Sequence, residues 1–284
     1  MDNSISKICL LLICMVAVVN AYTQPYLDIV SVRYVNSPDA GFINHNRKNI
    51  VLDYFNISTN LPVQFNGKRD AVIFSPFFES WASKTGSISK QHYYGVALPV
   101  TLSKSIGKKW NLLLTGIIRM NDSSISSKGQ MQAGGAIIGA WKKNDKLTWK
   151  FGCYLNGEYF GLFVMPLLGI DWRINSRNNV FGVLPGNLTY EHKLNDHFYY
   201  GACFRAITNS YAKNTGYWRV DENQLGLYLD TYLGKNLVLN AEAGHSLFRK
   251  IRTGIKHAGK TDLFVNDNLY AKISLAYRVR FHNK

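Results

Sequence analysis

The chain ends in LYAKISLAYRVRFHNK (residues 269–284), where apolar and polar side chains alternate without interruption. The odd positions are apolar or aromatic, and the even positions include Lys272, Arg278 and Arg280. Side chains of a β-strand point to opposite faces in turn, so this segment predicts a strand with one apolar face and one basic face. A strand of a soluble sandwich could show the same alternation. Whether the apolar face contacts a protein core or lipid has to be inferred from the rest of the chain.

The N-terminus has the composition of an export signal. Lys7 precedes an unbroken apolar run over residues 8–19, and Val19-Asn20-Ala21 resembles a small-residue cleavage site. The run is shorter than the roughly 20 residues that a membrane-spanning helix needs. We therefore expect residues 1–21 to be a signal peptide, with an uncleaved anchor as the alternative, and residues 22–284 to form one exported domain.

The same alternation recurs along the chain, with polar connections between the segments. Residues 94–102, 110–118, 147–155, 225–233 and 237–243 each place apolar side chains at every second position. Short turns such as SIGKK and KNDK alternate with longer polar loops, notably at 36–48, 82–91, 122–130, 211–223 and 250–268. Strands of about 10 residues joined in this way are typical of a transmembrane β-barrel. A lipocalin-like barrel would have its apolar face inside and would need a second domain at this length.

The number of strands depends on residues 180–193. If they formed one strand the count would be 13, but an even number places both termini on the periplasmic side. Pro185-Gly186 is a turn pair, and a short hairpin at this position raises the count to 14. Twelve strands stay open if a weak N-terminal segment is not a strand. The sequence therefore predicts an all-β antiparallel barrel of 12–14 strands in the outer membrane of a Gram-negative bacterium.

If the apolar face meets lipid, the opposite face lines the lumen, and its charges are of both signs. A mixed set favours an interior partly filled by ion pairs, whereas an open pore that selects ions segregates charge of one sign. The predicted lumen-lining residues are Arg119, Glu158, Asp171, Arg173, Arg205, Asp230, Glu242, Lys272, Arg278 and Arg280.

The expected partners follow from location and charge. The last strand ends in an aromatic residue, and Tyr277, Val279 and Phe281 are expected to form the signal that barrel-assembly machinery reads. The chain has a formal charge of +15. Many of its basic residues fall near the predicted strand ends, where they can contact outer-membrane lipid. A loop cluster could bind lipopolysaccharide or an anionic solute, or simply be solvated: Arg249, Lys250, Arg252, Lys256, His257 and Lys260. Nucleic acid is not expected as a partner of an exported barrel.

The sequence offers no catalytic or metal-binding pattern. His245 and Ser246 are adjacent, which places them on opposite faces of a strand, and no phosphate-binding glycine loop is found. Cys153 and Cys203 fall on opposite faces of their strands, so a disulfide is not expected. We expect a protein that is not an enzyme and that carries no cofactor and no metal.

Three segments resemble a known family. They are YYGVALPVTLSKSIGKKW (93–110), Gly-Ile-Asp-Trp at 169–172 and Leu-Pro-Gly at 184–186. They are similar to a family of outer-membrane barrels found in Bacteroidota and catalogued as domain of unknown function 6268. The resemblance covers most of residues 22–284. It implies an outer-membrane barrel and supplies no catalytic residues.

Two functional hypotheses remain from the sequence. The first is a barrel that passes or captures a small, anionic solute through its lumen. The second is a non-conducting structural or surface-interaction barrel with a lumen filled by salt bridges. An unobstructed path lined by arginines would favour the first, and closure by paired charges and tyrosines would favour the second.

Overall fold

The structure is a computed structural model that describes residues 24–43, 45–67, 70–86, 90–124, 131–255 and 259–281. The predicted signal peptide lies outside the described residues, as do Lys256 and His257 of the loop cluster. In the part of the chain that the structure describes, there is no helix long and apolar enough to cross a membrane. The strands are β1 (Tyr26–Phe42), β2 (His45–Thr59), β3 (Leu61–Phe65), β4 (Asp70–Phe74), β5 (Phe77–Thr85), β6 (Gln91–Ile106), β7 (Trp110–Asp122), β8 (Met131–Asn144), β9 (Leu147–Glu158), β10 (Gly161–Arg173), β11 (Asn178–Leu184), β12 (Asn187–Lys193), β13 (Phe198–Lys213), β14 (Gly216–Tyr232), β15 (Leu237–Gly254), β16 (Lys260–Phe264) and β17 (Leu269–Arg280).

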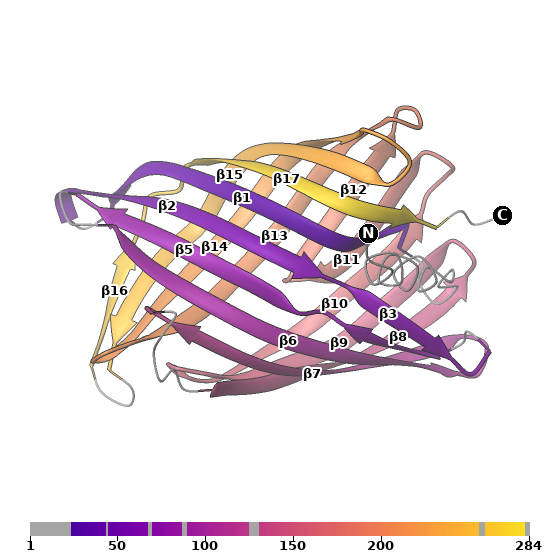
Figure 1. The fold of residues 1–284 in the computed structure, drawn as a ribbon, viewed down its shortest axis with the longest axis horizontal. Helices are drawn as coiled ribbons and strands as arrows, with labels where there is room; N and C mark the ends of the chain where they lie inside the picture. The colour runs from indigo at the N-terminus through magenta and orange to yellow at the C-terminus, as the bar shows by residue number, and fades with distance from the viewer. Residues whose placement is uncertain are drawn as a thin grey trace, which may run out of the picture.

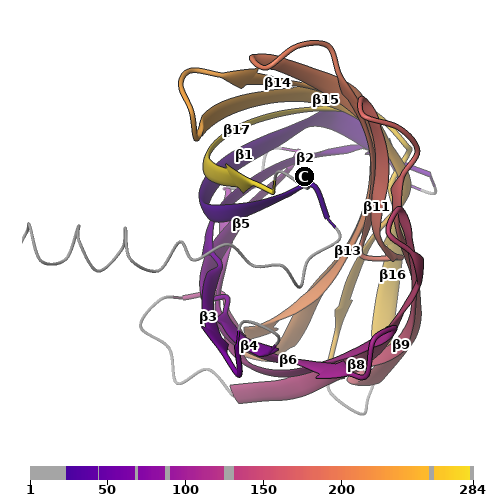
Figure 2. The ribbon, with the colours of Figure 1, turned by 90° about the vertical axis from the view of Figure 1, so that its right-hand side faces the viewer.

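These strands form one closed antiparallel barrel (Figures 1 and 2). Successive strands pair with one another except at β2/β3, β4/β5 and β16/β17, and β1 closes the circle by pairing with both β2 and β17. Three strands of the barrel are interrupted and carry two labels each: β2/β3, β4/β5 and β16/β17. β2 and β3 pair with β5 and β4 respectively. β16 and β17 both pair with β15. The barrel therefore has 14 strands, within the predicted range of 12–14.

The hairpin at Pro185-Gly186 is what makes the strand number even. β11 and β12 have seven residues each and pair with one another on either side of the turn. They lie in Figure 1 at the end of the barrel where β1 begins and β17 ends. We call this the turn end, and the opposite end, with β16, the loop end.

The outer surface is apolar, as the alternation predicted. Leu227 on β14 is 71% exposed, and Leu162 on β10 is 73% exposed, although both lie within regular strands. Ile273 and Leu275 of the C-terminal strand are on the same outer face. A belt of exposed leucine and isoleucine around a closed sheet is what a lipid-facing surface requires.

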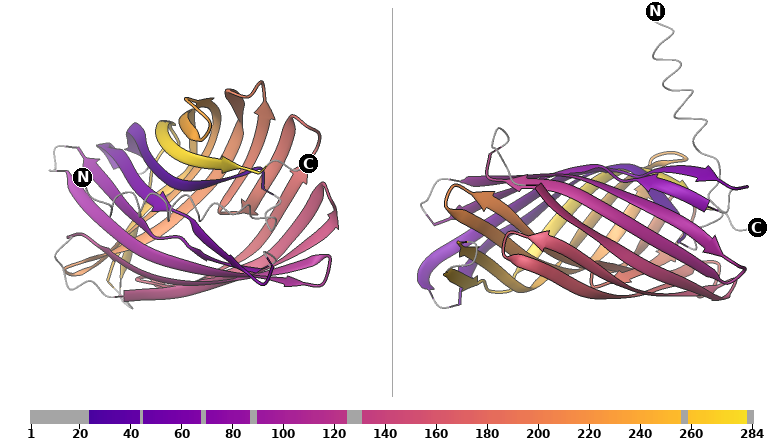
Figure 3. Two further views of the ribbon diagram at one scale, coloured as in Figure 1. Left: turned by 45° about the vertical axis from the view of Figure 1, so that its right-hand side comes forward. Right: turned by 90° about the horizontal axis from the view of Figure 1, so that it is seen from below.

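The predicted long loops at 36–48, 211–223 and 250–268 are wrong in part, because β1, β13, β14, β15 and β16 occupy much of them. Residues 36–42 belong to β1, and only residues 214 and 215 separate β13 from β14. β14 and β15 reach 17 and 18 residues, well beyond the length needed to cross the hydrocarbon. The additional residues of these strands face a hydrophobic core inside the loop half of the barrel, which includes Val35, Val220 and Ile251. Figure 3 shows the strands from two further directions, running obliquely around one barrel.

Candidate functional site: a charged cavity in the lumen

Aromatic side chains fill the loop half of the lumen. Trp81 of β5, Tyr93 of β6, Tyr211 of β13 and Trp218 of β14 are all buried and come from opposite sides of the barrel. The rings of Tyr93 and Trp218 stack with centroids 4.1 Å apart and planes within 3°. Tyr211 packs against the same two rings. We call these four residues the aromatic plug.

Buried carboxylates beside the plug are held by partners across the lumen. Glu79 accepts hydrogen bonds from the hydroxyls of Tyr54 (3.0 Å) and Tyr211 (2.6 Å) and from Asn209 Nδ2 (3.0 Å). Glu222 pairs with Arg249 Nε at 2.8 Å, and each side chain is 1% exposed. Because a buried charge is stable only when it is paired or hydrogen-bonded, this half of the lumen has the chemistry of a filled interior.

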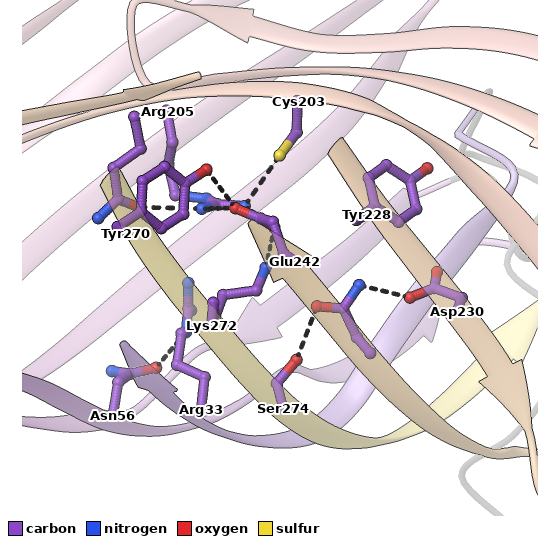
Figure 4. Close-up of polar contacts among 12 residues, drawn as sticks. Arg33, Asn56, Cys203, Arg205, Tyr228, Asp230, Glu242, Tyr270, Lys272 and Ser274 are labelled. Atoms are coloured by element: carbon purple, nitrogen blue, oxygen red, sulfur yellow. Dashed lines mark hydrogen bonds and ion pairs between the residues drawn. The ribbon is translucent and has the colours of Figure 1, made fainter. Parts of the chain in front are cut away.

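Toward the turn end, the lumen contains a cavity of about 290 Å³ with charged walls. Its centre is Glu242 of β15, drawn in Figure 4. Arg205 of β13 binds both carboxylate oxygens of Glu242, at 2.8 and 3.0 Å, and the Tyr270 hydroxyl donates to it at 2.7 Å. Lys272 of β17 forms a further ion pair with this carboxylate. Side chains of β13 and β17 therefore converge on one buried anion of β15.

A second ion-pair group lies on the same wall. Arg278 donates to Asp28 of β1 and to Asp230 of β14, both at 2.5 Å. Asn240 Nδ2 donates to the other oxygen of Asp230 at 2.6 Å. Asp28, Asp230 and Arg278 all line the cavity, so its floor is a network of satisfied charges.

Arg33 of β1 differs from the other cations of this cavity because it is not in an ion pair. Its Nε donates to Asn56 Oδ1 at 3.0 Å, and among the described residues no carboxylate lies within 4.0 Å of its guanidinium. The cavity lining has four cations (Arg33, Arg205, Lys272 and Arg278) and three carboxylates (Asp28, Asp230 and Glu242). Arg33 supplies the excess positive charge.

The facing wall has a different chemistry. A cavity of about 390 Å³ is lined in part by apolar side chains, such as Leu113 of β7 and Ile138 of β8. Its other lining residues are polar or charged, and they include Lys108, Lys109, Lys142 and the ion pair of Lys150 and Asp171 (2.7 Å). The facing wall is therefore mixed, with apolar side chains beside basic and polar ones.

The structure brings most of the predicted lumen residues into ion pairs. Arg119 pairs with Glu158, Asp171 with Lys150, and Arg280 with Glu191 at 2.5 Å. Arg205 and Lys272 pair with Glu242, and Arg278 with Asp230. Arg173 lines a separate cavity of about 380 Å³ at the turn end, near Lys146 and Lys193.

The terminal signal and the loop cluster stay predictions as binding sites. Tyr277 is exposed on the outer face, and Phe281 N donates to Pro25 O at 2.9 Å. Val279 is paired with Leu27 of β1. The loop cluster is not one exposed surface, because Arg249 is buried against Glu222 and Arg252 binds Asp262 at 2.5 Å.

Sequence reasoning missed Arg33, Glu79, Glu191 and Glu222. The alternation that would have identified Arg33 is present, since Val30, Val32 and Tyr34 are exposed on the outer face around it. Glu222 lay in a segment predicted to be a loop, and only its burial and its ion pair with Arg249 show that it faces inward. In the described part of the chain, no group of three or more His, Cys, Asp or Glu side chains is placed to hold a metal ion.

Comparison with known proteins shows the family. The family described as domain of unknown function DUF6268 matches residues 82–282, and the chain belongs to it. No curated protein matches the sequence. Among solved structures, a Pseudomonas aeruginosa FadL homologue is 10% identical, with a TM-score of 0.49 over 89% of this chain and 90% of the other. The toluene transporter TodX of P. putida is 9% identical, with a TM-score of 0.43 over 90% of each chain. These likenesses are distant, and nothing about a solute follows from them.

Proposed function

We propose that this chain is a transport barrel of the outer membrane that holds a small anionic solute in the turn-side half of its lumen, with the aromatic plug closing the loop side. The observation that supports this function is Arg33, which faces the cavity of about 290 Å³ without a carboxylate partner among the described residues. A cation that is exposed to a cavity and forms no ion pair attracts an anion, because the paired charges around it already compensate one another.

The first test measures binding of inorganic phosphate by the folded barrel. We expect phosphate to raise the unfolding temperature of the native protein and to have little effect on Arg33→Gln, since binding to the folded state alone stabilises it. Arg33→Lys keeps the charge and should retain part of the shift. Arg252→Gln, which removes a cation paired with Asp262 on the loop side, is the matched control and should keep the full shift.

The second test measures current through a planar bilayer in a potassium chloride gradient. We expect the native barrel to be silent, and the Tyr93→Ala/Trp218→Ala variant to conduct with a preference for anions. Adding Arg33→Gln should reduce that preference. Cation selectivity in the opened variant, or a preference that does not depend on Arg33, would contradict the proposal.

A non-conducting structural barrel is the second candidate, and the filled loop half of the lumen favours it. The ion pair of Glu222 and Arg249 and the hydrogen bonds to Glu79 give that half the packing of a core. Silence of the opened variant, together with no phosphate shift, would support this candidate. Heat-modifiable gel mobility establishes that each variant is folded before the current is measured.

A further inference from the structure

The barrel wall is incomplete between β10 and β13. β11 pairs with β10 only along residues 168–173, and the pairing of β12 with β13 ends at Arg205. Among the described residues, positions 161–167 of β10 pair with β9 alone. Beyond Arg205, β13 has on this side a single bridge, from Ala212 to Asp122 of β7. Each edge of this break therefore lacks a neighbouring strand.

The two edges bound a triangular break in the hydrogen-bonded wall. At Leu168 and Arg205 they are separated by the hairpin of β11 and β12, which corresponds to three strand spacings or about 14 Å. At the loop side they converge, since Tyr159 N donates to Ser210 Oγ at 3.1 Å. The hairpin tip forms the base, where Ala206 N donates to Pro185 O at 3.2 Å. We call residues 161–167 and 206–209 the lateral window.

The lateral window lies at the depth of the hydrocarbon. Leu162 and Val164 of its β10 edge point outward and are exposed, as is Leu168 at its base. Unpaired backbone is tolerated at membrane depth only where it is buried in protein or lines a water-containing cavity. Pro166 lies in the same edge, and proline, which has no N–H to donate, is confined to strand edges within sheets. The β10 edge of the window therefore lies between the lumen and the lipid.

The inner face behind this edge is apolar. By alternation, Phe163, Met165 and Leu167 point into the barrel, and all three remain partly exposed. Phe163 packs edge-on against Tyr154 of β9, with ring centroids 6.3 Å apart. By contrast, the inward positions of β14 and β15 hold polar side chains, among them Gln224, Asp230 and Glu242. An apolar lining that faces a lumen and is not buried has surface available for a hydrocarbon chain.

The charged cavity begins at the base of the lateral window. Asn187 pairs with Arg205 in the last row of the ladder between β12 and β13, next to Ala206 at the tip of the hairpin. Both Asn187 and Arg205 line the cavity that also contains Arg33. A molecule whose chain occupied the window could therefore place its head group among these cations.

We propose that the lateral window admits a single-chain anionic amphiphile between the lipid bilayer and the lumen. Its chain lies against Phe163, Met165 and Leu167, and its anionic head is held in the cavity of Arg33. This inference rests on the proposed anion-binding function and specifies the class of solute. The plug can remain closed during this exchange, because the window enters the lumen on the turn side of Ser210.

The test uses dodecyl phosphate and the barrel reconstituted in phosphatidylcholine vesicles. A photoreactive phenylalanine derivative replaces Met165 in one protein and Thr101 in the control, since Thr101 faces the lumen from β6 between two paired neighbours. We expect illumination to give dodecyl phosphate adducts at position 165 at least several-fold more often than at 101. Leu167 provides a second labelling position if the Met165 protein does not fold. Equal labelling at positions 165 and 101, or adducts with vesicle lipid alone, would overturn the proposal.

A blocking variant separates this inference from the function on which it rests. Ala206→Trp places a large ring at the base of the window and should lower dodecyl phosphate labelling several-fold while leaving the unfolding shift by inorganic phosphate unchanged. A phosphate shift that depends on Arg33 without labelling at position 165 would overturn the window alone. Loss of the phosphate shift in the native protein would overturn the anion site as well.

Discussion

Arg278 of β17 and Asp28 of β1 form a two-point ion pair across the seam at which the barrel closes. Arg278 Nε and Nη2 donate to the two carboxylate oxygens at 2.5 and 3.0 Å, and the two residues are direct partners in the strand register. Arg278 also binds Asp230 of β14, so one guanidinium joins the first strand to the last and to the wall beside them. The closing ladder and the charged cavity are therefore stabilised by the same side chain.

Removing Arg278 should destabilise the barrel more than removing an exposed cation. Arg278→Gln leaves Asp230, whose side chain is 1% exposed, without its cation, and loss of one partner of a buried pair costs about 3 to 5 kcal/mol. We expect a lower urea midpoint for unfolding in detergent, followed by gel mobility. In the β8–β9 turn, the ammonium of Lys142 lowers the pKa of Asp145, but this pair is exposed, so Lys142→Gln serves as a near-neutral control. Equal effects of the two variants would be inconsistent with a structural role for the seam.

The aromatic plug should contribute to stability as a packed core does. Trp218→Ala removes a ring stacked on Tyr93 and leaves a cavity, for which losses of about 3 to 5 kcal/mol are usual. Trp172→Ala removes the same side chain from the outer face of β10, where the ring is exposed, and should cost much less. Thermal unfolding monitored by near-ultraviolet circular dichroism distinguishes them. A plug variant as stable as the Trp172 variant would show that the loop half of the lumen is not packed.

The barrel was predictable because alternation depends on each strand alone. Every second residue from Leu269 to Phe281 is apolar whether or not its neighbours are known, and the lipid-facing surface is the sum of such strands. The even strand number also followed from a local signal, since Pro185-Gly186 defines a turn by its own chemistry. These features need no knowledge of which strands meet across the lumen.

The contents of the lumen could not be predicted in the same way. Trp81 and Trp218 lie 137 positions apart in the sequence, and only the closed register brings them into one plug. Glu222 and Arg249 looked like loop charges because their extension beyond the membrane carries no lipid-facing pattern. The lateral window depends on the relative lengths of four strands, and alternation gives strand boundaries too coarsely to show such a difference.

The terminal strand should control assembly in the membrane. Leu275→Asp places a charge on the lipid face of β17, and Phe281→Ser removes the final aromatic side chain. We expect both variants to reduce the amount of heat-modifiable barrel recovered from membranes, whereas Leu275→Ile should assemble normally. Unchanged recovery of the folded form in both variants would contradict a lipid-facing, assembly-directing role for this strand.

Gly226 should be required for the contact between Tyr270 and Glu242. A Cβ built on Gly226 would lie 2.2 Å from the Tyr270 hydroxyl, which donates to Glu242 at 2.7 Å. Gly226→Ala therefore should displace that hydroxyl and destabilise the barrel by about 1 to 2 kcal/mol, in the range of other overpacking substitutions. Tyr270→Phe removes the clashing oxygen, so the double variant should be less destabilised than the sum of the single variants predicts. Gly234→Ala is the matched control, because nothing lies within 4 Å of its Cβ position. Strict additivity of the two substitutions in urea unfolding would show that Tyr270 does not need the space that Gly226 leaves.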